Sequence, residues 1–190
     1  MVKEKFIKLV QRIILILFFF ISFYKYSYSN EIQKIIQKLE ETKNLKFDFI
    51  QTLDKSIETG NCILEFPNKF LCHYSELNKK KILIENNILY LVDELNTKSS
   101  RSITKTPFLF LTDKNEIIKA LKEIKDYKIT DNRISIKLSF SENETIDLYF
   151  DQKTFLIDGW KIINYDETFL EFILKNVSSN LQNIGRFTID

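Results

Sequence analysis

The chain has 190 residues, of which 44% are hydrophobic, 14% aromatic and 28% charged. This composition supports one folded domain and excludes a disordered polymer. Only 3 glycines are present, where average usage would give about 13, and they stand too far apart to form the Gly-rich loop of a nucleotide site. With one histidine and two cysteines, the sequence also lacks the ligands of common zinc sites. We expect no cofactor and no metal.

The formal net charge of +2 is unevenly distributed. The first 29 residues carry five basic and one acidic side chain, and the remainder carries 23 basic and 25 acidic ones. A nearly neutral remainder has no basic footprint for nucleic acid, and it gives no electrostatic reason to bind an anionic membrane. Nucleic acid is therefore not an expected partner.

The N-terminus has the layout of a secretory signal peptide. Basic residues precede the apolar run 13–23, and Ser27 and Ser29 are small residues at the positions that a signal peptidase reads. The alternative is an uncleaved anchor, but the uncharged stretch has only 12 residues, and a spanning helix needs roughly 20. We expect cleavage near Ser29, which leaves residues 30–190 as a single exported domain. No lipidation cysteine follows the apolar run, so the mature protein is expected to be soluble and untethered.

Two segments have apolar residues at the helical spacing i, i+3, i+4 and i+7. The first is 31–43, with Asn30 as a candidate N-cap and the apolar positions Ile32, Ile35, Ile36 and Leu39. The second follows the run Phe108–Leu111 and begins after Asp113, which with Glu116 forms a capping-box-like pair. Its apolar positions are Ile117, Ile118, Leu121 and Ile124.

The rest of the chain predicts strands with one apolar face. From Leu45 the apolar residues alternate with polar ones, and two β-prone runs flank the turn signal Pro67–Lys69. A hairpin centred there sets Cys62 opposite Cys72 and Leu64 opposite Phe70. Later runs alternate in the same way after turns at Asn86–Asn87 and at Ser141–Glu144. We count about eleven strands and two or three helices, a mainly β (α+β) domain with an antiparallel sheet.

The two cysteines can form a disulfide or remain as buried thiols. They are separated by nine residues and face each other across the predicted hairpin. An oxidising compartment permits a bond between them, whereas free cysteines would act as two small hydrophobic side chains. The sequence leaves both alternatives open.

No catalytic constellation is found. A Ser-His-Asp site would have to use His73, the single histidine, which the hairpin register turns away from the apolar face. Carboxylates fall mostly at turns and on wet faces, where solvation explains them. We expect no catalytic residue and no enzymatic activity.

Twelve of the 17 phenylalanines lie outside the predicted signal peptide. Several share a face with aliphatic neighbours. Ordinary core packing accounts for buried phenylalanine, and an alternative is that the sheet and the amphipathic helices enclose a lipophilic cavity. Periodicity does not distinguish the two.

Four segments in order resemble the outer-membrane lipoprotein carrier family, LolA, over roughly residues 44–178. They are GNCILEFPNKFLCHY, ILIENNILYLVDE, TPFLFL and DGWKIINYDETFLEFILKNVSSN. The resemblance implies an unclosed, strongly curved antiparallel β-barrel with a helical lid over an apolar cavity for acyl chains. The related receptor LolB is itself lipidated, so the missing lipidation cysteine favours the carrier.

Two positions depart from the family pattern. Phe66 stands where an arginine usually latches the lid, and Cys72 replaces a residue that is commonly tryptophan. Lid closure must then rest on hydrophobic contact or on another donor. The candidate cavity residues are Phe47, Phe49, Leu64, Phe66, Phe70, Ile136, Leu138, Leu148 and Phe172. The candidate lid residues are Ile32, Ile35, Ile36, Leu39, Phe108, Phe110, Ile117 and Leu121.

The resemblance implies a monomeric periplasmic chaperone that shields the acyl chains of lipoproteins between the inner and outer membranes. Its implied partners are acylated lipoproteins, an inner-membrane ABC exporter like LolCDE and an outer-membrane acceptor. A same-fold regulatory or receptor module that binds cargo without ferrying it remains an alternative. An exported hydrolase is a weaker one, because no arrangement of nucleophile and base is evident.

Overall fold

The computed structural model describes residues 30–189, except 54–55, 76–78, 94, 105, 140–143, 165 and 167. The predicted signal peptide, Phe140 and most of the expected turn at Ser141–Glu144 lie outside the described residues. The chain divides into two compact units, Met1–Lys34 and Ile35–Asp190. In the first unit the described residues form the start of helix α2 (Asn30–Glu41), which contains Ile32 and an ion pair of 3.3 Å between Glu31 and Lys34.

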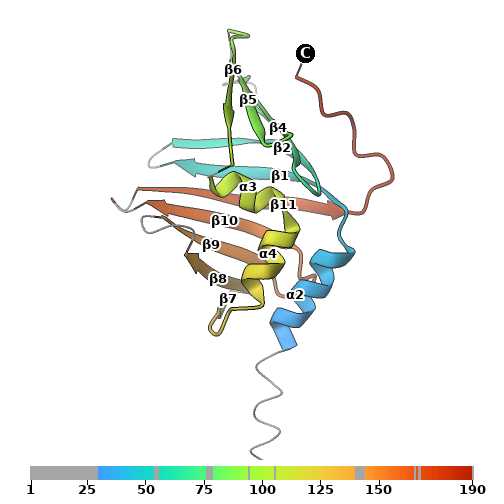
Figure 1. Cartoon of the computed structure of the whole chain (residues 1–190), viewed down its shortest axis with the longest axis vertical. Coiled ribbons are helices and arrows are strands. Elements are labelled where there is room, and N and C mark those ends of the chain that lie inside the picture. The colour runs from blue at the N-terminus through green and yellow to red at the C-terminus, as the bar shows by residue number, and fades with distance from the viewer. Residues whose placement is uncertain are drawn as a thin grey trace, which may run out of the picture. The chain divides into compact units, whose positions relative to one another are not determined.

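The second unit contains one antiparallel sheet (Figure 1). Its strands are β1 (Asn44–Leu53), β2 (Ser56–Glu65), β3 (Lys69–Tyr74), β4 (Lys81–Glu85), β5 (Ile88–Val92), β6 (Lys98–Ser102), β7 (Lys128–Thr130), β8 (Arg133–Ser139), β9 (Glu144–Asp151), β10 (Ile157–Asn164) and β11 (Phe169–Ser179). The described strands pair in the order β6-β5-β4-β3-β2-β1-β11-β10-β9-β8-β7. This confirms the predicted unclosed antiparallel sheet of eleven strands, with β6 and β7 at its edges.

Asparagine-containing turns set the register of two hairpins. Asn86 and Asn87 connect β4 to β5 with φ of 51° and 61°, and Asp131 and Asn132 connect β7 to β8 with φ of 52° and 63°. Two consecutive residues with positive φ match the twist of the flanking strands, and asparagine tolerates that conformation better than most side chains. The turn predicted at Asn86–Asn87 is confirmed.

The β2–β3 hairpin has the predicted register. Cys62 lies opposite Cys72, and Leu64 lies opposite Phe70. Across β2, the same pairing continues into β1, where Leu45 and Phe47 face Leu64 and Cys62. The hairpin therefore places its apolar residues on the same side of the sheet as those of β1.

Two helices, α3 (Pro107–Thr112) and α4 (Lys114–Leu121), lie between β6 and β7; α4 is the second helix predicted from the sequence, and α3 comprises the run that precedes it. Asp113 separates them because its backbone is extended, with φ −112° and ψ 101°. Its N–H donates to the carbonyl oxygens of Leu109 and Phe110 and closes α3. Its carboxylate accepts from the N–H of Asn115 at 2.9 Å, as an N-cap of α4. The predicted cap at Asp113 is correct, and the helix predicted after it ends at Leu121, so that Ile124 lies beyond α4.

The sheet is buried on both sides at β3 and β4, which the alternating pattern does not predict. Leu71 and Leu83 are buried on the face opposite to Phe70, where they pair with each other and with Ile63. The segment after β11 lies on this side, since a Cβ added to Gly185 would stand 3.8 Å from Cδ1 of Ile63. The C-terminal segment thus covers part of the face that we expected to be wet.

Candidate functional site

One side of the sheet carries a continuous set of apolar side chains, which we call the apolar face. Strand pairing puts all the following residues on this side. They are Phe47, Phe49, Cys62, Leu64, Phe70, Cys72, Ile136, Leu138, Leu148, Trp160 and Phe172. All are buried, with exposed fractions of 0% to 8%. The pattern of alternation in the sequence therefore identified eight of its residues, and Trp160 was missed as a site residue.

Stacked aromatic rings form the middle of the apolar face. The rings of Phe49 and Phe172 are 4.5 Å apart at 21°, and those of Trp160 and Phe172 are 4.6 Å apart at 3°. Phe47 meets Phe172 edge to face at 6.5 Å, and Tyr74 meets Phe49 at 4.9 Å. Aromatic pairs in these geometries stabilise beyond the area they bury. The cluster joins β1, β3, β10 and β11.

An aliphatic row continues from the rings towards β8. Trp160 lies opposite Leu148, and Leu148 lies opposite Ile136. Both aliphatic side chains have no exposed surface, and Leu138 on the same strand is 8% exposed. The charged residues of this region, such as Lys161 and Glu171, pair across the opposite side.

The residues of the apolar face are buried in this structure. Hollows of about 540 Å³ and 410 Å³ occur elsewhere, among polar side chains that include Lys79 and Lys80 in one and Lys119 and Lys122 in the other. None of the eight predicted residues on the apolar face lines either of these hollows. A cavity for acyl chains stays a prediction, and it requires movement away from the packed state.

Phe66, the ninth candidate for the cavity, has a different position. It lies in the turn that follows β2 and is half-buried. The ammonium group of Lys114 stands 6.0 Å from the centre of its ring. Phe66 is thus next to the start of α4 rather than within a strand of the apolar face.

The helices bury most of the candidate lid residues. In the second unit, Ile35, Ile36 and Leu39 of α2 are 0%, 6% and 2% exposed, and Ile117 and Leu121 of α4 are 0% and 1% exposed. Phe108 and Phe110 of α3 are only half-buried. Aromatic side chains that remain partly exposed on a short helix are available for further contacts.

Hydrogen bonds join the hairpin turn and the helices where the family arginine is missing. The N–H of Asn68 donates to the carbonyl oxygen of Thr112 at 2.9 Å, while the Thr112 hydroxyl donates within α3 to the carbonyl oxygen of Phe108 at 2.9 Å. Lys114 Nζ donates to the carbonyl oxygens of Glu40 at 3.1 Å and Thr42 at 2.9 Å. A cation at the C-terminal end of α2 also interacts favourably with the helix dipole. Lys114 and the main chain of Asn68 thus make the hydrogen bonds around Phe66 in this structure.

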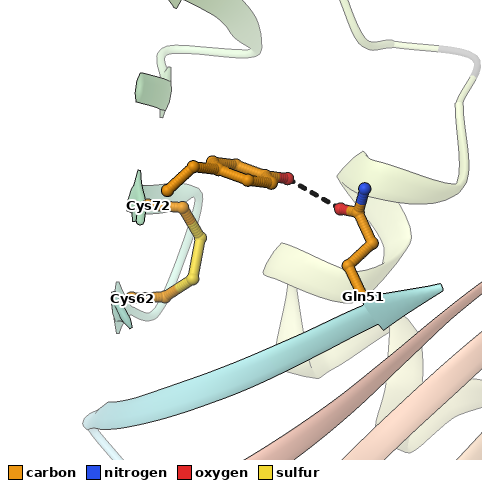
Figure 2. The surroundings of a disulfide bond; sticks show 4 residues. Gln51, Cys62 and Cys72 are labelled. Carbon is orange, nitrogen blue, oxygen red and sulfur yellow. Dashed lines mark hydrogen bonds between the residues drawn. A yellow bond between two sulfur atoms is a disulfide. The ribbon is translucent and has the colours of Figure 1, made fainter. Parts of the chain in front are cut away.

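A buried polar network lies at one end of the apolar face. The Tyr74 hydroxyl donates to Gln51 Oε1 at 2.7 Å, the bond drawn as a dashed line in Figure 2. Gln51 Nε2 donates to Glu58 at 2.8 Å, and Glu58 accepts from Lys80 at 2.6 Å and 2.9 Å. Burial, and secondarily the Glu58 carboxylate, raises the pKa of Tyr74 well above its usual range. Gln51 occupies an inward position of β1, where its amide is paired on both sides.

Cys62 and Cys72 form a disulfide across β2 and β3 (Figure 2). Each residue is 1% exposed, and the two Cα atoms are 4.2 Å apart. Of the two alternatives that the sequence left open, the structure has the bonded one. A bond of this kind persists in an oxidising compartment.

The remaining candidates for chemistry are separated from the apolar face. His73 lies opposite Asn61 and Lys81, on the other side of the sheet, as predicted. Burial and the Lys81 ammonium group lower its pKa. Among the described residues, no three His, Cys, Asp or Glu side chains are grouped to hold a metal, and no helix in that part of the chain has the length and apolarity to cross a membrane.

The topology and the apolar face can be compared with known proteins. The family model of the outer membrane lipoprotein carrier protein LolA matches residues 40–189. The chain belongs to the LolA family. The family is described by carriage of lipoproteins rather than by a catalysed reaction, and this chain shares its open antiparallel sheet.

Several solved structures match this chain at low sequence identity. A chain of the Pseudomonas aeruginosa MucA/MucB complex matches at TM-score 0.49 and 8% identity, over 82% of this chain and 58% of that one. The Mycobacterium tuberculosis lipoprotein LppX matches at 0.46 and 8%, over 82% and 97%. A LolA superfamily protein from Nitrosomonas europaea matches at 0.41 and 8%, over 83% and 97%. The chain thus spans less than two thirds of the MucA/MucB chain. A search of curated proteins found no significant match.

Proposed function

We propose that this LolA-family protein is a periplasmic chaperone that shields the acyl chains of lipoproteins and carries them from the inner to the outer membrane. The observation that carries the proposal is the apolar face, which extends without a charged side chain from the disulfide on β2 and β3 to Ile136 on β8. Family membership supports the cargo. Transfer between membranes and the periplasmic location are proposed on the same grounds.

Shielding is the physical task of such a carrier. Exposing an acyl chain to water costs about 0.8 kcal/mol per methylene, so two long chains need a large apolar surface. The apolar face offers this surface once α3 and α4 move away and acyl chains take the place of protein contacts. The packed arrangement described above is then the closed state of the carrier.

Loading and release require that the closed and open states differ little in free energy. A ligand shifts an equilibrium only by its differential affinity for the two states. A main-chain hydrogen bond from Asn68 to Thr112 links the hairpin to α3 and would have to break on opening. We propose that an ATP-dependent exporter at the inner membrane supplies the cargo and that an outer-membrane acceptor removes it, so this chain needs no nucleotide site of its own.

Direct binding can be measured with the unmodified protein. Trp160 is the single tryptophan of the chain and lies in the ring stack. A lipopeptide with brominated acyl chains should quench its fluorescence, whereas the same peptide without chains should not. Quenching that fails while the protein is folded would contradict acyl-chain binding at the apolar face.

Paired variants test which side of the sheet binds. Leu64→Glu places an unpaired charge on the apolar face, and Ile63→Glu places the same charge on the neighbouring residue of the opposite side. We expect loss of lipopeptide binding only in Leu64→Glu, with export of both variants maintained. Because Leu64 is buried, the free energy of unfolding must be measured for each. Equal binding by the two folded variants would overturn the assignment of the face.

Depletion in cells distinguishes a carrier from a receptor or regulatory module. A carrier is required for sorting, so its loss should leave lipoproteins in the inner membrane. Intact sorting after depletion, together with lipopeptide binding in solution, would favour the module that holds cargo without ferrying it.

A further inference from the structure

Trp160 has a polar group that the closed structure leaves unused. Its side chain is 5% exposed, and its indole N–H is buried without a hydrogen-bond partner among the described residues. Buried tryptophan N–H groups usually find an acceptor. An orphaned donor at the centre of an apolar face therefore needs an explanation.

The fold holds this donor firmly in place. The indole is stacked on the ring of Phe172, with a centroid distance of 4.6 Å and nearly parallel planes. In the sheet, Trp160 lies opposite Leu148 of β9 and opposite Phe172 of β11. Next to it, a Cβ added to Gly159 would stand 2.4 Å from the carbonyl oxygen of Phe172. The backbone of β10 is thus closely packed against β11, and the donor is fixed before any ligand arrives.

The surroundings define the acceptor chemically. On the apolar face, the neighbours of Trp160 are aromatic and aliphatic, and the charged residues Lys161, Glu171 and Asp147 pair across the opposite side. A carboxylate would be desolvated there without a counter-charge, which is costly. A neutral carbonyl at the head of a hydrocarbon chain avoids that cost and accepts one hydrogen bond.

We propose that the indole N–H of Trp160 donates a hydrogen bond to an ester carbonyl of the acylated cargo. The inference rests on the proposed function and adds a chemical preference to it, for ester-linked over ether-linked chains. In the packed structure the donor has no partner among the described residues. A cargo carbonyl that accepts from this N–H removes the free-energy penalty of the unpaired donor. That penalty is larger than the net contribution of an ordinary hydrogen bond.

The test compares two lipopeptides that differ only at the linkage. One carries two palmitoyl chains as esters, and the other carries hexadecyl ethers at the same positions. We expect wild-type protein to bind the ester about two- to tenfold more tightly, the range that corresponds to one net hydrogen bond. The chain has one tryptophan, so the NMR spectrum of the ¹⁵N-labelled protein has one indole N–H signal. This signal should move downfield when the ester binds and should not do so when the ether binds.

Two variants separate the donor from the stack. Trp160→Phe keeps an aromatic ring and removes the N–H, so the ratio of ester to ether affinity should fall to about one. Phe172→Leu disturbs the stack and keeps the N–H, so binding should weaken while the ratio persists. If Trp160→Phe does not fold, the indole signal and the affinity ratio of the wild-type protein still decide the matter.

The outcomes are distinct. An ester preference with a shifted indole signal supports the inference. Equal binding of both lipopeptides by the wild-type protein, or a preference retained in Trp160→Phe, overturns the role of Trp160 and leaves the proposed function standing. Failure of both lipopeptides to bind overturns the proposed function and the inference together.

Discussion

The backbone N–H of Asn68 donates a 2.9 Å hydrogen bond to the carbonyl oxygen of Thr112, which joins the β2–β3 turn to the last residue of α3. Beside it, Lys114 at the start of α4 donates to two carbonyl oxygens at the end of α2. The hairpin and the ends of three helices are thus connected around Phe66, the position where the family usually has an arginine. The hydrogen bonds that connect them come from main chain and from a lysine.

Removing the lysine should loosen the helices. We expect Lys114→Met to keep the aliphatic stem and lose both hydrogen bonds, each of which involves a charged donor. Their partial exposure limits the loss to about 1 kcal/mol, so amide exchange in α3 and α4 should be roughly fivefold faster. Hydrogen exchange measured by mass spectrometry checks this. Lys119→Met, an exposed change on the same helix, is the matched control, and equal exchange in both variants would contradict the assigned link.

The disulfide should contribute substantially to stability. Cross-linking Cys62 and Cys72 closes a loop of about ten residues, and the loop-entropy model assigns about 2–3 kcal/mol to such a closure. A double variant with alanine at both positions should unfold at lower urea concentration by about 1 M, with an unchanged m-value. Reductant should lower the midpoint of the wild-type protein and leave that of the double variant where it is. An identical midpoint for the oxidised protein and the double variant would contradict the prediction.

Two tyrosines predict a loss of stability at high pH. Burial comes first among the causes that raise the pKa of both Tyr74 and Tyr149, with nearby carboxylates adding to it. A group with a raised pKa in the folded state stabilises the protein fully below its unfolded pKa of about 10 and loses that contribution as the pH rises further. Each of them should lower the free energy of unfolding by up to about 1.4 kcal/mol per pH unit above pH 10.

Phenylalanine variants separate this effect from the titration of lysines. Tyr74→Phe should reduce the slope of unfolding free energy against pH above pH 10, and addition of Tyr149→Phe should reduce it again. Urea unfolding at a series of pH values measures the slope. The wild-type slope in the double variant would show that these hydroxyls are not the source. Tyr74→Phe should also lower stability at neutral pH, because the buried Oε1 of Gln51 then loses its hydrogen-bond donor.

Asn180 should stabilise the junction between α2 and the end of β11. Its side chain accepts from the N–H of Lys43 at 2.7 Å and donates to the carbonyl oxygen of Glu41 at 3.0 Å, and its φ is 56°. Asn180→Gly loses the two side-chain bonds and tolerates the backbone, whereas Asn180→Ala also incurs strain of about 1–2 kcal/mol. Thermal unfolding should therefore rank wild type above glycine and glycine above alanine. Equal values for the two variants would exclude the backbone contribution.

The sequence predicted those elements whose side chains alternate between two environments. Phe47 and Phe49 are buried, while Lys46 before them and Asp48 between them are exposed, so the sequence shows the two-residue period of a strand. The register of the β2–β3 hairpin could be predicted from its turn, because the position and length of the turn fix which residues of the two strands lie opposite each other. The strands β6 and β7 carry only exposed residues, and therefore had no pattern from which they could be predicted individually.

The site was predictable in part, for a related reason. The face of the sheet followed from alternation, but contacts that depend on the approach of distant segments did not. In the sequence Lys114 is one of several polar residues of a helix, and only the fold places it beside Glu40. Likewise, Gln51 interrupts an apolar pattern, and only the structure shows that it pairs with Tyr74 and Glu58. Trp160 was one of many aromatic residues, and only its unpaired N–H sets it apart.

The open edges of the sheet have a consequence for how this protein meets its neighbours. Unprotected edge strands can pair with other chains and lead to aggregation. A closed barrel has no such edges, but it also has no opening through which the sheet could separate to accept a ligand. Here the edge strands are short and polar, five residues in β6 with Lys98 and Arg101, and three in β7 with Lys128. A strand added to either edge would form few backbone hydrogen bonds and would have to desolvate a lysine or arginine side chain. The sheet can thus remain open at its edges without pairing with the strands of other chains.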